Sequence, residues 1–341
     1  MKLTFEQIKA CTKGAMEVRS ENGAAAFYRF SPAQSAPYDL PECPEERFRY
    51  TCDMSASVML DFWTDAEAIT LTLSGTCRDG RPEIPLDILE NGTMVNSAKI
   101  VRTIDSTGQV VPYGTATFRF PLSKGEKRVT VCPFYLTVNR ISDVILENAA
   151  TFRPYEHART MLAFGDSITQ GHNCVHSSLT YVNQLAVLLD AEVHNYGIGG
   201  ETFWDKKIIP GTYPRCDLVT VAYGTNDYTK CTAEEFDHHM PAFMQAAAAE
   251  FPDVPVFVIL PIWRQVDIRG VRRVQGRTLE EVRELLRQEA KKYPNFHVIE
   301  GWDLVPHHAA FYGDTTLLHP NDLGDTFYAR NLYREMMKVL G

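Results

Sequence analysis

The sequence predicts an α/β domain with a parallel sheet, preceded by an all-β sandwich of jelly-roll type. Three observations predict this fold class. Between about residues 51 and 150, apolar and polar residues alternate at period two, as in half-buried strands. After Arg153-Pro154, short apolar runs alternate with longer segments of helical period, which is the α/β pattern. The 341 residues are enough for two domains, expected at 1–154 and 155–341.

The first half begins with an expected short helix, for which Thr4 is the N-cap and Gln7 completes a capping box. Strands at regular spacing follow, which suggests an antiparallel sandwich. An Asn-Gly-Thr triplet at 91–93 matches a glycosylation signal, but a hairpin turn explains it more simply. Turn-forming residues separate the expected strands at Gly75, Asp79-Gly80, Asn91-Gly92 and Lys124-Gly125.

The second half combines five short apolar runs with helical segments, so a parallel sheet covered by helices is expected. The predicted strands are Met161–Phe164, Glu192–Asn195, Leu218–Tyr223, Val256–Leu260 and Phe296–Ile299. Helices are expected at Leu179–Leu189, after Thr232 and Thr278 with capping boxes closed by Glu235 and Glu281, and from about Asp325 to Leu340.

Composition and charge exclude several classes of function. The net charge of −9 comes from interleaved acidic and basic residues without a basic run, so no nucleic-acid partner is expected. No window approaches the roughly 18 apolar residues that span a bilayer, so no membrane partner is expected either. The first residues lack the apolar stretch of a signal peptide, which predicts a cytoplasmic location. Eight cysteines without a C-x-x-C pair are interpreted as reduced thiols.

Four segments place polar residues just after predicted strands, at the edge where open α/β sheets bind ligands. A serine hydroxyl needs a base, and a tetrahedral intermediate needs hydrogen-bond donors at its oxyanion. These segments offer both kinds of group. They are Gly165-Asp166-Ser167, the loop from Gly197 to Glu201, Gly224-Thr225-Asn226-Asp227 and His319-Pro320.

With these blocks in this order, the chain from about 160 to 340 resembles the GDSL (SGNH) hydrolase family of serine esterases. The resemblance implies a flavodoxin-like three-layer sandwich with Ser167 as nucleophile and His319 as general base. It also implies an oxyanion hole from the N–H groups of Ser167 and Gly200 and the side-chain amide of Asn226. Gly200 is preferred to Gly199 because an acidic-Thr pair follows it. The β-rich first half is similar to domains that precede some carbohydrate acetyl esterases.

The sequence departs from the family pattern near the histidine. The family carries an aspartate three residues before it, where this chain has Thr316. Asp314 can take that role only if the loop bulges. The alternatives are that Asp314 is a turn residue, and that a backbone carbonyl orients His319 in a Ser-His dyad.

Other residues have less specific interpretations. Trp204 and Trp263 follow predicted strand ends, where an indole could stack on a sugar or pack in the core. His238 and His239 are adjacent in a predicted helix and should point to different faces, so no metal site is expected. The loop from Gly197 to Gly200 is not a complete Gly-x-Gly-x-x-Gly, so no nucleotide cofactor is expected.

The sequence therefore predicts a serine esterase that removes a short acyl group, acetyl above all, from a carbohydrate or related polar alcohol through an acyl-enzyme. Two alternatives remain: a lipase-like or thioester hydrolase, and a carbohydrate-binding protein without catalysis. The small-molecule substrate is the one partner expected, and the sequence leaves the oligomeric state open.

Overall fold

The computed structural model describes residues 1–77, 83–101, 113–265, 270–273 and 275–341. The chain divides into two compact units. The first comprises Met1–Phe30, Tyr50–His157 and His176–Ser178, and the second comprises Ser31–Arg49, Ala158–Val175 and Leu179–Gly341. The predicted division into 1–154 and 155–341 differs from these units mainly in two short segments. Residues 31–49 group with the second unit although they precede most of the first, and residues 176–178 group with the first.

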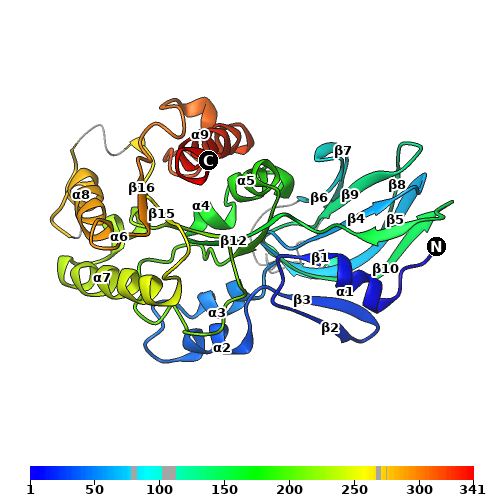
Figure 1. The fold of residues 1–341 in the computed structure, drawn as a ribbon, viewed down its shortest axis with the longest axis horizontal. Coiled ribbons are helices and arrows are strands. Elements are labelled where there is room, and N and C mark those ends of the chain that lie inside the picture. Colours follow the sequence, from blue (N-terminus) through cyan, green and yellow to red (C-terminus); the bar gives the residue numbers. More distant parts are fainter. Residues whose placement is uncertain (78–82, 102–112, 266–269, 274) are drawn as a thin grey trace, which may run out of the picture. The chain divides into compact units, whose positions relative to one another are not determined.

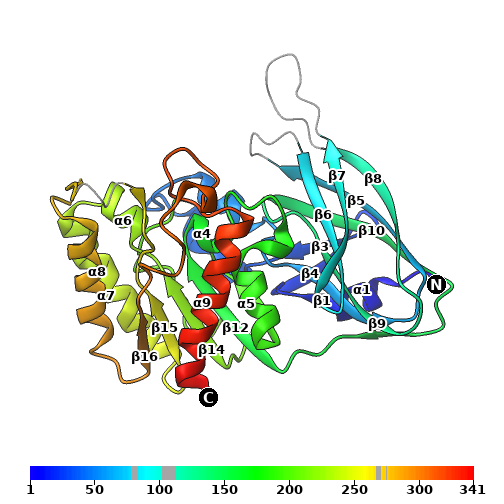
Figure 2. The ribbon, with the colours of Figure 1, turned by 90° about the horizontal axis from the view of Figure 1, so that it is seen from above.

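The first unit contains two antiparallel sheets (Figures 1 and 2). In β10 (Thr137–Glu147), buried positions alternate with partly buried ones over much of the strand. One face of this strand therefore covers a core. One sheet has the order β1 (Thr12–Lys13), β4 (Met59–Thr64), β9 (Lys127–Cys132), β6 (Glu83–Glu90) and β7 (Thr93–Val101), with β11 (Phe152–Pro154) beside β4. The other has the order β2 (Glu17–Glu21), β3 (Ala24–Tyr28), β10 (Thr137–Glu147), β5 (Ala68–Cys77) and β8 (Tyr113–Pro121).

Local signals in this unit were mostly correct. The helix α1 (Phe5–Cys11) has the predicted capping box of Thr4 and Gln7. Asn91 and Gly92 join β6 to β7 with φ of 49° and 80°, the positive values of a tight hairpin turn. The turn expected at Gly75 is wrong: this glycine lies inside β5, where the register against β8 shifts. The expected turn at Asp79-Gly80 lies outside the described residues.

The second unit is built on a parallel sheet that contains all five predicted strands. When the five strands are numbered along the chain, their spatial order across the sheet is 2-1-3-4-5, which is the flavodoxin-like order. The carboxyl ends of the first three strands are therefore neighbours, and the loops that leave them meet at one edge. The sheet order is β13 (Ala191–Asn195), β12 (Arg159–Gly165), β14 (Leu218–Ala222), β15 (Val256–Ile259) and β16 (Phe296–Ile299).

Helices cover both faces of this sheet. The helices α5 (Tyr181–Leu189) and α9 (Asp322–Leu340) lie on one face, and α7 (Ala233–Glu250) lies on the other (Figure 1). The predicted capping boxes begin α7 and α8 (Leu279–Ala290). The predicted α/β/α sandwich is therefore confirmed. The short helices α2 (Pro32–Ser35) and α3 (Arg47–Cys52) were not predicted.

Two further findings bear on the expectations from composition. Among the helices of the described residues, none combines the length and the apolar character that a bilayer crossing requires. The cysteines whose side chains the structure describes carry free thiols.

Candidate active site

Ser167 lies where β12 ends and the short helix α4 (Ser167–Gln170) begins. The side chain of Asp166 accepts a hydrogen bond from the Ile168 N–H at 2.9 Å, which caps the helix and sets its first residue. The residue before Asp166 must be glycine, because a Cβ at Gly165 would lie 2.0 Å from the hydroxyl oxygen of Thr169. The Ser167 N–H belongs to the first turn and has no intrahelical partner, so it can donate to a ligand.

His319 contacts both Ser167 and Asp314. The Oγ of Ser167 lies 2.8 Å from Nε2 of His319, and Nδ1 of the same ring lies 2.9 Å from Oδ2 of Asp314. The loop bends back through Leu317, which has a φ of 49°, and the Gly313 N–H donates to the His319 carbonyl at 2.9 Å. This bend brings Asp314, five residues before the histidine, into the position that the family's spacing gives to a closer aspartate.

The Asp314 carboxylate is held by several donors. The backbone N–H of His319 and the side-chain amide of Asn173 each donate to Oδ2 at 2.9 Å, and the Thr316 N–H donates to Oδ1 at 2.9 Å. Partial burial opposes ionisation, but the hydrogen bonds from His319 and Thr316 outweigh it and hold the pKa of Asp314 below its usual value. The carboxylate is therefore charged at neutral pH and can stabilise a positive His319 ring.

Sequence reasoning missed two residues at this site, His172 and Asn173. The His172 ring lies edge-on to the His319 ring, with centroids 4.6 Å apart. Asn173 adopts a φ of 73° and, as noted, donates to Asp314. Their position five and six residues after Ser167, just beyond the end of α4, is the one signal in the sequence that could have pointed to them.

The loop after β13 distinguishes Gly200 from Gly199 as a donor. The Gly199 N–H already donates to the side chain of Gln170 at 2.8 Å. The Gly200 N–H donates to no other described residue. Gly200 has a φ of 89°, which favours glycine, and a Cβ there would meet the Arg47 guanidinium at 2.2 Å. The geometry therefore agrees with the choice of Gly200.

Asn226 lies in the first turn of α6 (Thr225–Lys230), after β14 and Gly224. Its side-chain amide donates to the Glu201 carbonyl at 3.0 Å, and an amide nitrogen carries a second N–H that can donate to a ligand. The first bond ties Asn226 to the loop that carries Gly200. The two expected oxyanion donors are thus held in one fixed arrangement.

Replacing Asn226 by alanine should lower kcat by about 10² to 10³-fold with little change in KM, because an oxyanion donor acts mainly in the transition state. Steady-state kinetics on a soluble ester measures both constants. Asn226→Asp is the matched variant, since it keeps the shape but replaces the donor with an acceptor, and it should lose at least as much. An effect confined to KM would instead assign Asn226 to substrate positioning.

A buried ionic network supports the same loop. The Glu201 carboxylate accepts hydrogen bonds from Lys207 at 2.8 Å and from the hydroxyls of Tyr38 and Tyr223, both at 2.6 Å. All four side chains are buried. A buried charge pair of this kind is stable only when its hydrogen bonds are satisfied. Tyr38 comes from the segment 31–49, so this hydrogen bond joins that segment to the rest of the second unit.

The two tryptophans occupy different positions. Trp263 is 3% exposed, packs in the core and stacks on His307 with ring centroids 5.1 Å apart. It therefore presents no open face to a sugar. Trp204 is also buried, against Tyr38, but it lines a cavity of about 220 Å³ that adjoins Gly200. Its role in substrate binding stays a prediction.

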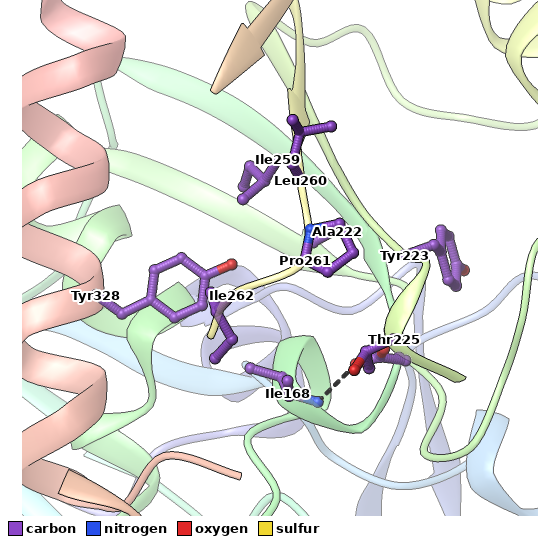
Figure 3. A pocket seen from close by; sticks show the side chains of 10 residues that line it. Ile168, Ala222, Tyr223, Thr225, Ile259, Leu260, Pro261, Ile262 and Tyr328 are labelled. Carbon is purple, nitrogen blue, oxygen red and sulfur yellow. Dashed lines mark hydrogen bonds between the residues drawn. The ribbon is translucent and has the colours of Figure 1, made fainter. Parts of the chain in front are cut away.

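A second cavity, drawn in Figure 3, is enclosed mainly by apolar side chains, among them Ile259 at the end of β15, Ile262 in the loop that follows and Tyr328 of α9. Its volume of about 20 Å³ has room for a single water molecule. Asp166 lines the same cavity, and burial raises its pKa to about 7. This space is too small for an ester substrate. The larger cavity adjoins the site through Gly200, although Ser167 and His319 are not among its lining residues.

Residues 163–326 match the model of the GDSL-like lipase/acylhydrolase family. They form a GDSL-type hydrolase domain. The match includes Ser167, Gly200, Asn226, Asp314 and His319, which the structure brings together in one unit.

Solved structures with a similar fold cover nearly the whole chain. The salicylyl-acyltransferase SsfX3 from a tetracycline biosynthetic pathway is 18% identical, covers 96% of this chain and 94% of its own, and has a TM-score of 0.75. A protein described as a GDSL-like lipase from Bacteroides ovatus is 15% identical, with coverages of 100% and 98% and a TM-score of 0.76. The acetyl xylan esterase Est2A from Butyrivibrio proteoclasticus is 12% identical, with coverages of 100% and 98% and a TM-score of 0.63. None of the curated proteins matches. At these identities the likeness shows the fold alone.

Proposed function

We propose that this GDSL-type enzyme is a serine esterase that removes a short acyl group, acetyl above all, from a carbohydrate or related polar alcohol. The observation that carries the proposal is the continuous chain of contacts from Ser167 through His319 to Asp314, at 2.8 and 2.9 Å. This chain lies in the same unit as the donors Gly200 and Asn226. Such an arrangement performs acyl transfer with a covalent intermediate.

In the proposed reaction, Ser167 Oγ attacks the ester carbonyl while its proton moves to Nε2 of His319. The negative charge that forms on the carbonyl oxygen accepts hydrogen bonds from the Ser167 and Gly200 N–H groups and from Asn226. His319 then returns the proton to the oxygen of the leaving alcohol. A water molecule, deprotonated by the same nitrogen, hydrolyses the acyl-enzyme and restores Ser167.

The cavity beside Gly200 supports a polar substrate with a short acyl group. It measures about 220 Å³, and polar or charged side chains, among them Thr202, Lys230 and Glu235, supply much of its lining. A lipase-like enzyme would need a long apolar groove instead. The similarity in fold to a protein named as an acetyl xylan esterase is in keeping with this proposal.

Hydrolysis of p-nitrophenyl esters of increasing acyl length tests the proposal directly. The expected result is the highest kcat/KM on the acetate and a steady fall toward the octanoate, because a long chain finds no apolar groove. Acetylated xylose and xylan then test the alcohol side. A preference for longer chains would favour a lipase-like or thioester hydrolase, and no turnover above that of Ser167→Ala would favour a binding protein.

A further inference from the structure

Asp205, His238 and His239 form a compact cluster at the surface of the second unit. The two histidines lie on α7, and Asp205 lies in the loop that follows Trp204. Nδ1 of His239 is 3.1 Å from Oδ1 of Asp205, and Nε2 of His238 is 4.0 Å from Oδ2 of the same carboxylate. One ligand atom from each residue lies within 4.8 Å of the others.

This arrangement differs from the sequence-based expectation. Adjacent residues of a helix point about 100° apart, so the two histidines were expected on different faces. Instead both side chains reach Asp205, and their ring centroids are 4.9 Å apart with an angle of 67° between the planes. Flexible χ angles allow the two imidazoles to converge on one carboxylate even though their Cα atoms are offset around the helix.

We propose that Asp205, His238 and His239 bind a transition-metal dication of the Zn²⁺ type. Two imidazoles and one carboxylate are ligands that suit Zn²⁺, Ni²⁺ and Co²⁺, whereas Mg²⁺ and Ca²⁺ prefer oxygen ligands alone. Three protein ligands leave at least one position for water. His239 also lines the cavity beside Gly200, but none of the three ligands is Ser167, His319 or Asp314, so metal binding does not require the proposed Ser167 chemistry.

The state of His239 is the second observation that points to a ligand. Its Nδ1 is buried but makes no hydrogen bond of acceptable geometry with the described residues, although Asp205 lies nearby. A buried ring nitrogen without a proper partner is destabilising. A metal ion between His239 and Asp205 would satisfy both groups at once.

The required movement is small. Ligand atoms around a tetrahedral zinc ion lie about 3.4 Å apart, given bonds of about 2.0 to 2.1 Å. The cluster spans 3.1 Å to at most 4.8 Å. His238 is 67% exposed, so its ring can rotate toward the other two ligands without disturbing the core.

Nearby carboxylates make the local field favourable to a cation. Glu234, Glu235 and Asp237 line the same surface hollow as the two histidines. Glu235 accepts the N-cap hydrogen bonds of Thr232, and Asp237 is paired with Arg277, so these two act through charge rather than as ligands. The proposed ion would connect α7 to the loop between Trp204 and Lys207, close to Glu201 and the oxyanion loop.

Metal binding by the full chain, stripped with EDTA and desalted under reducing conditions, tests the proposal. Isothermal titration with ZnCl₂ should show one saturable site, and MgCl₂ at the same concentration should show none. Co²⁺ should give the visible absorption of a tetrahedral nitrogen and oxygen site. Binding should also raise the melting temperature of the protein, whether or not it is active as an esterase.

Variants locate the site. His239→Ala and Asp205→Ala should each weaken Zn²⁺ binding by more than ~100-fold, because even changes outside the ligand sphere cost 10 to 100-fold. His238→Ala changes a mostly exposed side chain, keeps the protein folded, and should also weaken binding. His308→Ala, which removes another exposed histidine of the same unit, should leave binding unchanged. Equal Zn²⁺ affinity in wild type and His238→Ala, or no saturable binding by wild type, would overturn the proposal.

Discussion

Replacing Ser167 by alanine is expected to lower kcat by ~10³-fold or more, and replacing His319 by alanine should do the same. The reason is the 2.8 Å contact between Ser167 Oγ and His319 Nε2, through which the two groups act as one proton-transfer unit. Because they act together, the double variant should lose little more than either single variant. Initial rates of p-nitrophenyl acetate hydrolysis measure the loss in both single variants and in the double variant.

The controls for this experiment separate loss of chemistry from loss of fold. Each variant should keep the melting temperature of wild type to within a few degrees, since neither Ser167 nor His319 belongs to the hydrophobic core cluster of this unit. His308→Ala, a histidine that makes no contact with Ser167, should keep normal turnover. Near-normal kcat for a pure Ser167→Ala protein would show that another group is the nucleophile.

Replacing Asp314 by asparagine is expected to lower kcat by up to ~10⁴-fold. The carboxylate lies 2.9 Å from Nδ1 of His319, where, in the proposed mechanism, it would stabilise the imidazolium that forms as Ser167 attacks. The low pKa of Asp314 keeps it ionised at neutral pH, so this stabilisation is present there and is lost only as the pH falls toward that pKa. Asparagine removes the charge and can present an N–H to the ring instead.

A matched variant distinguishes this electrostatic role from loop structure. The Thr316 hydroxyl donates to the other oxygen of Asp314, so Thr316→Ala removes that hydrogen bond while it keeps the carboxylate and the Thr316 N–H bond to it. It should reduce kcat by less than about 10-fold, because only one exposed hydrogen bond is lost. If Asp314→Asn also remains within about 10-fold of wild type, the histidine works in a Ser-His dyad. Thr316→Asp then tests whether the family's spacing can rescue Asp314→Asn.

Much of the hydrolase domain follows from the sequence alone, because the signals that specify it are local. The five strands of the parallel sheet lie where apolar runs predict them. Capping boxes such as Thr232 with Glu235 depend on residues three positions apart, so they are visible without the fold. The order of the polar blocks singled out Ser167 and His319 as candidates, and their side chains do lie 2.8 Å apart at the edge where strand ends of such a sheet converge.

Only the tertiary structure decided which of several possible partners meet. The approach of Asp314 to His319 depends on the left-handed backbone of Leu317, which no local pattern predicts. The sequence already favoured Gly200 over Gly199, but only the fold shows that the Gly199 N–H is occupied by a hydrogen bond to Gln170, which is distant in sequence. Asp205 likewise meets the two histidines of α7 across more than thirty residues. Such contacts depend on how a loop closes over a packed core, and that closure is set by the sum of many distant interactions rather than by neighbouring residues.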